Sequence, residues 1–205
     1  MNCSTTTAIY IITFMTATIE PYNPEWKTEF ENIKQIIESE FKDSGIDINI
    51  QHVGSTAIPG LVAKPILDLD IIIPDKSHFN KISSKLEKLG YKNKGEQGIP
   101  DRIAFRQTTE ATPFLLSNNK KKYPHHLYVC LTESLAVKNH LLFRDALLSN
   151  KELSERYSQL KLALIGNQPI SREEYTKRKT EFIISVLAAS GLGETELKQI
   201  RDANR

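Results

Sequence analysis

A run of Ile and Leu between Pro65 and Ile73 restricts the fold of this chain more than any other segment. Asp68 and Asp70 are the only charged residues in the run, and Pro74 ends it. A short apolar run that stops at a proline predicts a strand buried on both faces. Residues two apart in a strand project to the same face. The two carboxylates are therefore expected side by side in an otherwise apolar strand.

Two ionised carboxylates in such a strand need compensation. Each unpaired buried charge would cost several kcal/mol, and the two would repel each other. Mg²⁺ meets both needs, because it takes carboxylate oxygens and keeps positions for waters and substrate phosphates. The alternative is that the aspartates lie at the end of the strand and pair with Lys64 or an arginine. The spacing alone leaves both interpretations open.

A Gly54-Ser55 pair precedes this strand. It follows a half-buried strand that the alternation of Ile46, Ile48 and Ile50 with polar residues predicts. Glycine lets the backbone approach a ligand closely, so a Gly-Ser turn can present N–H groups and a hydroxyl to a phosphate. On its own such a pair is usually only a turn. Together with the acidic strand it predicts a phosphate cradle that faces a metal site.

The remaining pattern predicts helices around a few strands. Helices are expected over 24–41, 77–89, 134–149, 151–165 and 171–189, and further strands over 102–107 and 126–131. The last helix opens with a capping box of Ser171 and Glu174. Lys120, Lys121 and Lys122 are expected in a solvated loop. The order of elements predicts an α+β fold: a small mixed sheet covered by helices on one side, and a helical C-terminal third.

The composition favours an ordinary cytoplasmic domain. Hydrophobic residues make up 40% and charged residues 25% of the 205 residues, and the net charge of +2 argues against a general polyanion binder. Cys3 and Cys130 have no metal-ligand spacing and indicate no oxidising compartment. The apolar residues 8–15 are too few to span a bilayer and lack the basic start of a signal peptide. They predict a loose tail or an extra edge strand, and no membrane partner is expected.

The segment from His52 to Gly60, together with the Asp-Leu-Asp strand, resembles the GrpB family, a branch of the nucleotidyltransferase superfamily. Residues 22–26 resemble the opening helix of that family. The segments that begin at Phe143, Tyr157 and Glu174 resemble its helical end. We therefore expect an N-terminal extension over residues 1–18, a GrpB-like domain over 19–190 and a C-terminal tail over 191–205.

The resemblance implies the polymerase-β-like nucleotidyltransferase fold, with Gly54-Ser55 and the pair Asp68 and Asp70 matching the motifs of that superfamily. In superfamily enzymes the two aspartates bind Mg²⁺, often with a third carboxylate on a neighbouring strand. This chain shows no clear third acid, which puts that part of the pattern in doubt. Asp101 is one candidate and Glu110 another, and the spacing selects neither.

The strand over 126–131 departs from the family pattern. The family usually has His-Leu-His-Val there, whereas this chain has His126 and then Tyr128 in place of the second histidine. Both side chains would share one face of the strand and border the metal site. His126 is either a third metal ligand or a histidine that is hydrogen-bonded within the sheet. The tyrosine argues against a metal site shared by two histidines.

The first functional hypothesis is therefore a Mg²⁺-dependent enzyme that moves a nucleoside monophosphate from an NTP to an unknown acceptor. Gly54, Ser55 and Lys64 would hold the phosphates. Arg102 or Arg106 would steady the triphosphate, although each is equally explained as part of a surface ion pair.

The second hypothesis is a non-catalytic domain that binds a nucleotide or a protein. The family resemblance includes copies fused to a coenzyme A biosynthetic kinase, for which a folding-helper role is suggested. A fold does not by itself imply activity. A nucleic-acid partner is less favoured, because the net charge is small and the basic runs lack interleaved aromatic residues.

Overall fold

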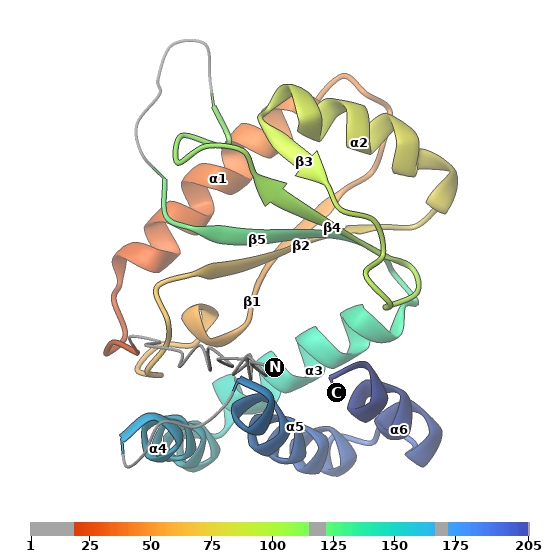
Figure 1. Ribbon diagram of the computed structural model, residues 1–205. Helices are drawn as coiled ribbons and strands as arrows, with labels where there is room; N and C mark the ends of the chain where they lie inside the picture. Colours follow the sequence, from red (N-terminus) through yellow and green to blue (C-terminus); the bar gives the residue numbers. More distant parts are fainter. Residues whose placement is uncertain (1–18, 115–121, 167–171, 205) are drawn as a thin grey trace, which may run out of the picture.

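The computed structural model describes residues 19–114, 122–166 and 172–204. The elements are, in chain order, α1 (Glu25–Phe41), β1 (Asn49–Val53), β2 (Leu67–Ile73), α2 (Phe79–Lys88), β3 (Tyr91–Asn93), β4 (Arg102–Gln107), β5 (His125–Leu131), α3 (Leu135–Ser149), α4 (Lys151–Gly166), α5 (Arg172–Ala189) and α6 (Glu194–Ala203). Short 3₁₀ helices, Ser55–Ala57 and Lys76–His78, follow β1 and precede α2. The expected α+β class is confirmed (Figure 1).

The five strands form one mixed sheet in the order β1-β2-β5-β4-β3. The central pair, β2 and β5, is parallel, and the other neighbours are antiparallel. The acidic strand β2 is therefore an interior strand with a hydrogen-bonded neighbour on each side. This placement explains its nearly continuous apolar sequence.

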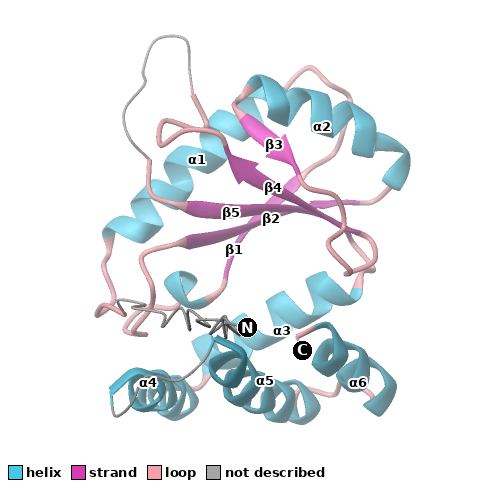
Figure 2. Cartoon of the chain, viewed as in Figure 1, coloured by secondary structure: helices cyan, strands magenta, loops and turns pink. Residues whose placement is uncertain are grey.

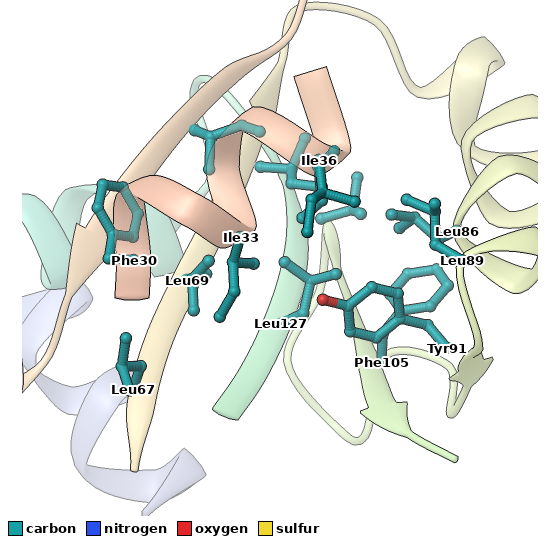
Figure 3. Close-up of a cluster of buried hydrophobic side chains, with 14 of the residues drawn as sticks. Phe30, Ile33, Ile36, Leu67, Leu69, Leu86, Leu89, Tyr91, Phe105 and Leu127 are labelled. Atoms are coloured by element: carbon teal, nitrogen blue, oxygen red, sulfur yellow. The ribbon is translucent and has the colours of Figure 1, made fainter. Parts of the chain in front are cut away.

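One face of the sheet packs against α1 and α2 and forms the main core (Figure 3). Leu67 and Leu69 of β2 are fully buried on this face. Ile33 of α1 and Leu86 of α2 lie against it from the helical layer. The helical spacing of apolar residues in α1 and the period of two in β2 bring these side chains together.

The opposite face carries the alternate residues of β2, which are Asp68, Asp70 and Ile72. At one end of this face Ile72 and Cys130 pack against Ala136 of α3. The sheet is thus covered on both faces, whereas the sequence led us to expect helices on one side only. The difference arises because α3 crosses beneath the sheet, and the helices that follow it in the chain lie below the sheet as well (Figure 2).

The C-terminal helices form a separate layer below the sheet (Figure 1). Tyr157 of α4 joins this layer to the loop after β1 through a buried cluster with Ile58 and Leu61. The chain after Gly191, expected as a tail, forms α6. Ile200 of α6 is buried in a cluster that also holds α5 side chains. A short amphipathic helix with several charged residues gives a weak sequence signal, which is why the pattern did not predict it.

Other boundaries differ from the sequence-based expectations by a few residues. The first strand was expected over 46–50 but runs from Asn49 to Val53, because Ile46 is buried in the connection that leads into it. The three-residue strand β3 was not expected. The N-terminal extension, the helix cap at Ser171 and the lysines at 120 and 121 lie outside the described residues.

Candidate functional site

Asp68 and Asp70 project from the face of β2 that lies opposite the main core. In the sheet register Asp68 is paired with Val53 and His126, and Asp70 is paired with Tyr128 of β5. The Asp70 side chain is completely buried, whereas 32% of the Asp68 side chain is exposed. The expected side-by-side arrangement of the two aspartates on one strand face follows from this register.

Each carboxylate is bound to a histidine. His126 Nδ1 donates to Asp68 Oδ1 at 2.9 Å, and His140 Nδ1 donates to Asp70 Oδ2 at 2.7 Å. Burial lowers the pKa of His140, but the charge of Asp70 and the hydrogen bond to it outweigh burial, so that the pKa of His140 is raised above its ordinary value. The buried Asp70 is thus hydrogen-bonded to a histidine of α3 whose protonated form Asp70 favours.

The Gly-Ser turn lies directly against the acidic strand. Gly54 has a φ of 70°, and a Cβ atom at this position would collide with the carboxylate of Asp68. Only glycine therefore permits this approach of the backbone. Ser55 then begins the 3₁₀ helix, and its side chain is hydrogen-bonded to Tyr157 of α4.

A cavity of about 670 Å³ opens between the sheet and the C-terminal helices. The Gly-Ser turn, Asp68, His126 and His140 line one side of it. The helical layer contributes aromatic and basic side chains, namely Phe143, Tyr157, Lys161, Tyr175 and Lys179. The cavity is thus bordered by the acidic strand on one side and by lysines of the helical layer on the other.

The structure brings together most of the predicted site residues. Gly54, Ser55, Lys64, Asp68 and His126 all line the same cavity. The buried Asp70 is connected to this cavity through His140, which lines it.

The two predicted arginines do not line that cavity. Arg102 lies over the Tyr128 ring, 4.5 Å from its centroid, and lines a neighbouring cavity of about 600 Å³. Arg106 lines neither of these two cavities. Of the candidates for a third acid, Asp101 lines the neighbouring cavity and Glu110 lines neither. The assignment of both arginines to the triphosphate stays a prediction.

Sequence reasoning did not identify the residues that α3, α4 and α5 contribute. His140 is separated from Asp70 by 70 positions, and no local spacing connects them. Lys161 and Lys179 gave no signal of their own. Each of them, however, falls within a segment that resembles the helical end of the GrpB family. That resemblance was the available clue that these helices complete the site.

The donor set fits a hard divalent cation that keeps open coordination positions. Oδ1 of Asp70 is buried and has no hydrogen-bond partner among the described residues. Asp68 still has Oδ2, which lies next to Gly54. Within the described ranges no group of three or more His, Cys, Asp and Glu side chains is arranged to hold a metal ion. Mg²⁺ usually binds through one or two carboxylates together with waters and substrate phosphates, so the two carboxylates match its usual coordination by protein.

Comparison with known proteins decides the family. The sequence profile described as "GrpB protein" matches residues 16–189, which is most of the chain. The chain belongs to the GrpB family. A curated relative from Bacillus subtilis (strain 168), UPF0157 protein YqkA, is 32% identical over 162 residues. The match covers 79% of this chain but only 43% of the relative, so this chain spans less than half of that protein.

Solved structures agree with this membership. The crystal structure of the conserved protein GrpB from Enterococcus faecalis superposes with a TM-score of 0.68 at 26% identity. That match covers 84% of this chain and 96% of the other. A cytoplasmic RNA terminal U-transferase matches with a TM-score of 0.50 at 15% identity, over 70% of this chain and 42% of that enzyme. The GrpB fold of this chain is therefore similar to a nucleotidyltransferase fold.

No helix within residues 19–114, 122–166 and 172–204 is long and apolar enough to cross a bilayer.

Proposed function

We propose that this protein is a Mg²⁺-dependent nucleotidyltransferase that moves a nucleoside monophosphate from an NTP to an acceptor. One observation carries the proposal: Asp68 and Asp70 share a strand face, and the Gly54 backbone packs against the Asp68 carboxylate at the edge of a large cavity. The similarity to a nucleotidyltransferase fold supports it. In such a transfer the acceptor attacks the α-phosphorus, the bond to the bridging β-phosphate oxygen breaks and pyrophosphate leaves.

In this proposal the residues at the cavity have separate roles in binding the metal and the phosphates. Asp68 and Asp70 would hold Mg²⁺, and His126 and His140 fix the orientation of their carboxylates through one oxygen each. When bound, Mg²⁺ neutralises charge on the phosphates and on the leaving pyrophosphate. The Ser55 hydroxyl, which borders the cavity, and the N–H groups at the start of the 3₁₀ helix would donate to phosphate oxygens, with the Ser55 hydroxyl turning from Tyr157 to do so.

The test is ligand binding followed by a product assay. Thermal shifts are measured with ATP, GTP, CTP and UTP, each with and without Mg²⁺, because a ligand that binds only the native state raises its stability. Asp68→Asn and Asp70→Asn should abolish the Mg²⁺-dependent part of the shift. Asp47→Asn is the control, since Asp47 is exposed and precedes β1. Absence of NTP binding at millimolar Mg²⁺ would refute the proposal.

A second candidate function is a non-catalytic nucleotide-binding domain. The observation that favours it is the residue next to Asp70 on β5, where Tyr128 stands and supplies no third carboxylate. Pyrophosphate release distinguishes the two functions. An enzyme releases pyrophosphate from Mg²⁺-NTP when a competent acceptor is present, and the release is lost in Asp68→Asn. A binding domain shows the same Mg²⁺-dependent thermal shift without any release.

A further inference from the structure

The lining of the main cavity is rich in lysine. Lys64 comes from the loop before β2, Lys161 from α4 and Lys179 from α5. Among the described residues that line the cavity, Asp68 is the only carboxylate, and it is already bound to His126. The cavity wall therefore carries more positive than negative charge.

Lys161 is the most unusual of the three, because only 3% of it is exposed. Its Nζ donates to the Val62 carbonyl and lies 4.7 Å from the centroid of the Tyr157 ring. In the described part of the chain no carboxylate lies within ion-pair distance of this nitrogen. Burial, followed by repulsion from Lys179, lowers the pKa of Lys161 to about 7. A buried ammonium without a counter-ion is unfavourable for the fold, and such groups concentrate at binding sites.

The groups around Lys161 suit an anion with several oxygens. The hydroxyls of Tyr157 and Ser55 line the cavity and are bonded to each other. Lys64 lies over the Tyr175 ring, 5.6 Å from its centroid, which places a second ammonium near the α5 wall. Lysine binds phosphate as a point charge, without the two-pronged geometry that arginine requires. Several ammonium groups along one wall suit an extended chain of phosphates better than a single carboxylate.

We propose that Lys161 and Lys179, together with Lys64, form a polyphosphate-binding subsite, so that α4 and α5 supply the positive charge for the phosphate chain. The proposal rests on the proposed function where it names the triphosphate of an NTP as the source of that chain. The subsite itself requires only linked phosphates, which inorganic tripolyphosphate also provides. It assigns to two helical lysines the role that sequence reasoning gave to Arg102 and Arg106.

The first experiment uses inorganic tripolyphosphate, without Mg²⁺ and without any nucleotide. Its affinity is measured by calorimetry for the full chain and for Lys161→Met and Lys179→Met. Each variant should bind tripolyphosphate at least tenfold more weakly. Lys177→Met is the matched control, because Lys177 is an exposed lysine on α5 that does not line the cavity. It should stay within about twofold of the unaltered chain.

The outcomes separate this proposal from the proposed function. Tripolyphosphate binding that Lys161→Met and Lys179→Met leave unchanged, or that Lys177→Met weakens equally, overturns the subsite even where Mg²⁺-NTP binds. Loss of tripolyphosphate binding in the two cavity variants supports the subsite even where no NTP is bound. An NTP that binds more tightly than tripolyphosphate, and is weakened by the same two variants, identifies the nucleotide as the source. Melting temperatures of all variants without ligand confirm that they are folded.

Discussion

Nδ1 of His140 lies 2.7 Å from Oδ2 of Asp70, and this contact connects α3 to the middle of the sheet. The Asp70 side chain has no exposed surface, and its other oxygen, Oδ1, is buried without a partner among the described residues. The same contact therefore gives the buried carboxylate a hydrogen-bond donor at one oxygen and leaves the other oxygen without one. The helical layer thus supplies, through His140 of α3, the hydrogen-bond donor of the buried carboxylate in β2.

Replacing His140 should be strongly destabilising. In His140→Gln the buried carboxylate of Asp70 loses the imidazole that is hydrogen-bonded to it, and breaking a buried pair from one side costs about 3–5 kcal/mol. The double variant Asp70→Asn/His140→Gln should recover most of this loss, since no uncompensated charge remains. Urea unfolding at pH 7 measures both. A loss below about 1 kcal/mol in His140→Gln would show that the contact contributes little.

Gly54→Ala tests the close approach of the turn to the acidic strand. Gly54 has φ 70° and faces the Asp68 carboxylate, whereas Gly60 has φ 80° and an added Cβ there would meet nothing within 4 Å. Gly60→Ala should therefore cost only the backbone term of about 1 kcal/mol. Gly54→Ala should cost about 1–3 kcal/mol more, because the turn or the carboxylate must move. Equal losses in urea unfolding would contradict the contact.

The parts of the fold that could be predicted are those with a local period. The spacing of apolar residues in α1 and the apolar run around Asp68 and Asp70 placed a helix and a buried strand correctly. β3 could not be found this way, because Tyr91 and its two successors form a strand only through their pairing with β4. His140 was missed for the same reason. Its partner is chosen by the packing of α3 beneath the sheet, which no short window of sequence records.

The stability of the protein should fall as the pH is lowered from 6.5 to 4. Burial is the main cause that lowers the pKa of His52 and of His125 to about 4. Unfolded chains bind these protons near pH 6.5 and the folded protein only near pH 4, so acid favours unfolding across this window. At pH 5 each histidine should cost about 2 kcal/mol relative to pH 7.

Urea unfolding at pH 7 and pH 5 measures this loss. His125 is bonded to the buried Tyr91 hydroxyl at 2.7 Å, so His125→Gln lowers stability at both pH values but should shrink the difference between them. His78→Gln is the control, because this histidine is only partly buried, on the short helix before α2. A pH difference that His125→Gln leaves unaltered would show that His125 titrates normally in the folded protein.

Replacing Lys161 should change the stability of the protein in the absence of ligand. Burial and then Lys179 depress the pKa of Lys161 to about 7, so the unfolded chain holds this proton up to about pH 10.5 and the folded protein does not. The stability of the unaltered protein should thus rise with pH from about 7 to 10.

Lys161→Met removes this dependence of stability on pH. It also removes an amine whose burial without a counter-ion costs free energy, although the bond to the Val62 carbonyl is lost. Lys161→Met should therefore melt at a higher temperature than the unaltered protein at pH 7 while binding tripolyphosphate more weakly. A lysine kept for structure would give the opposite sign, a lower melting temperature, and this single comparison separates the two roles.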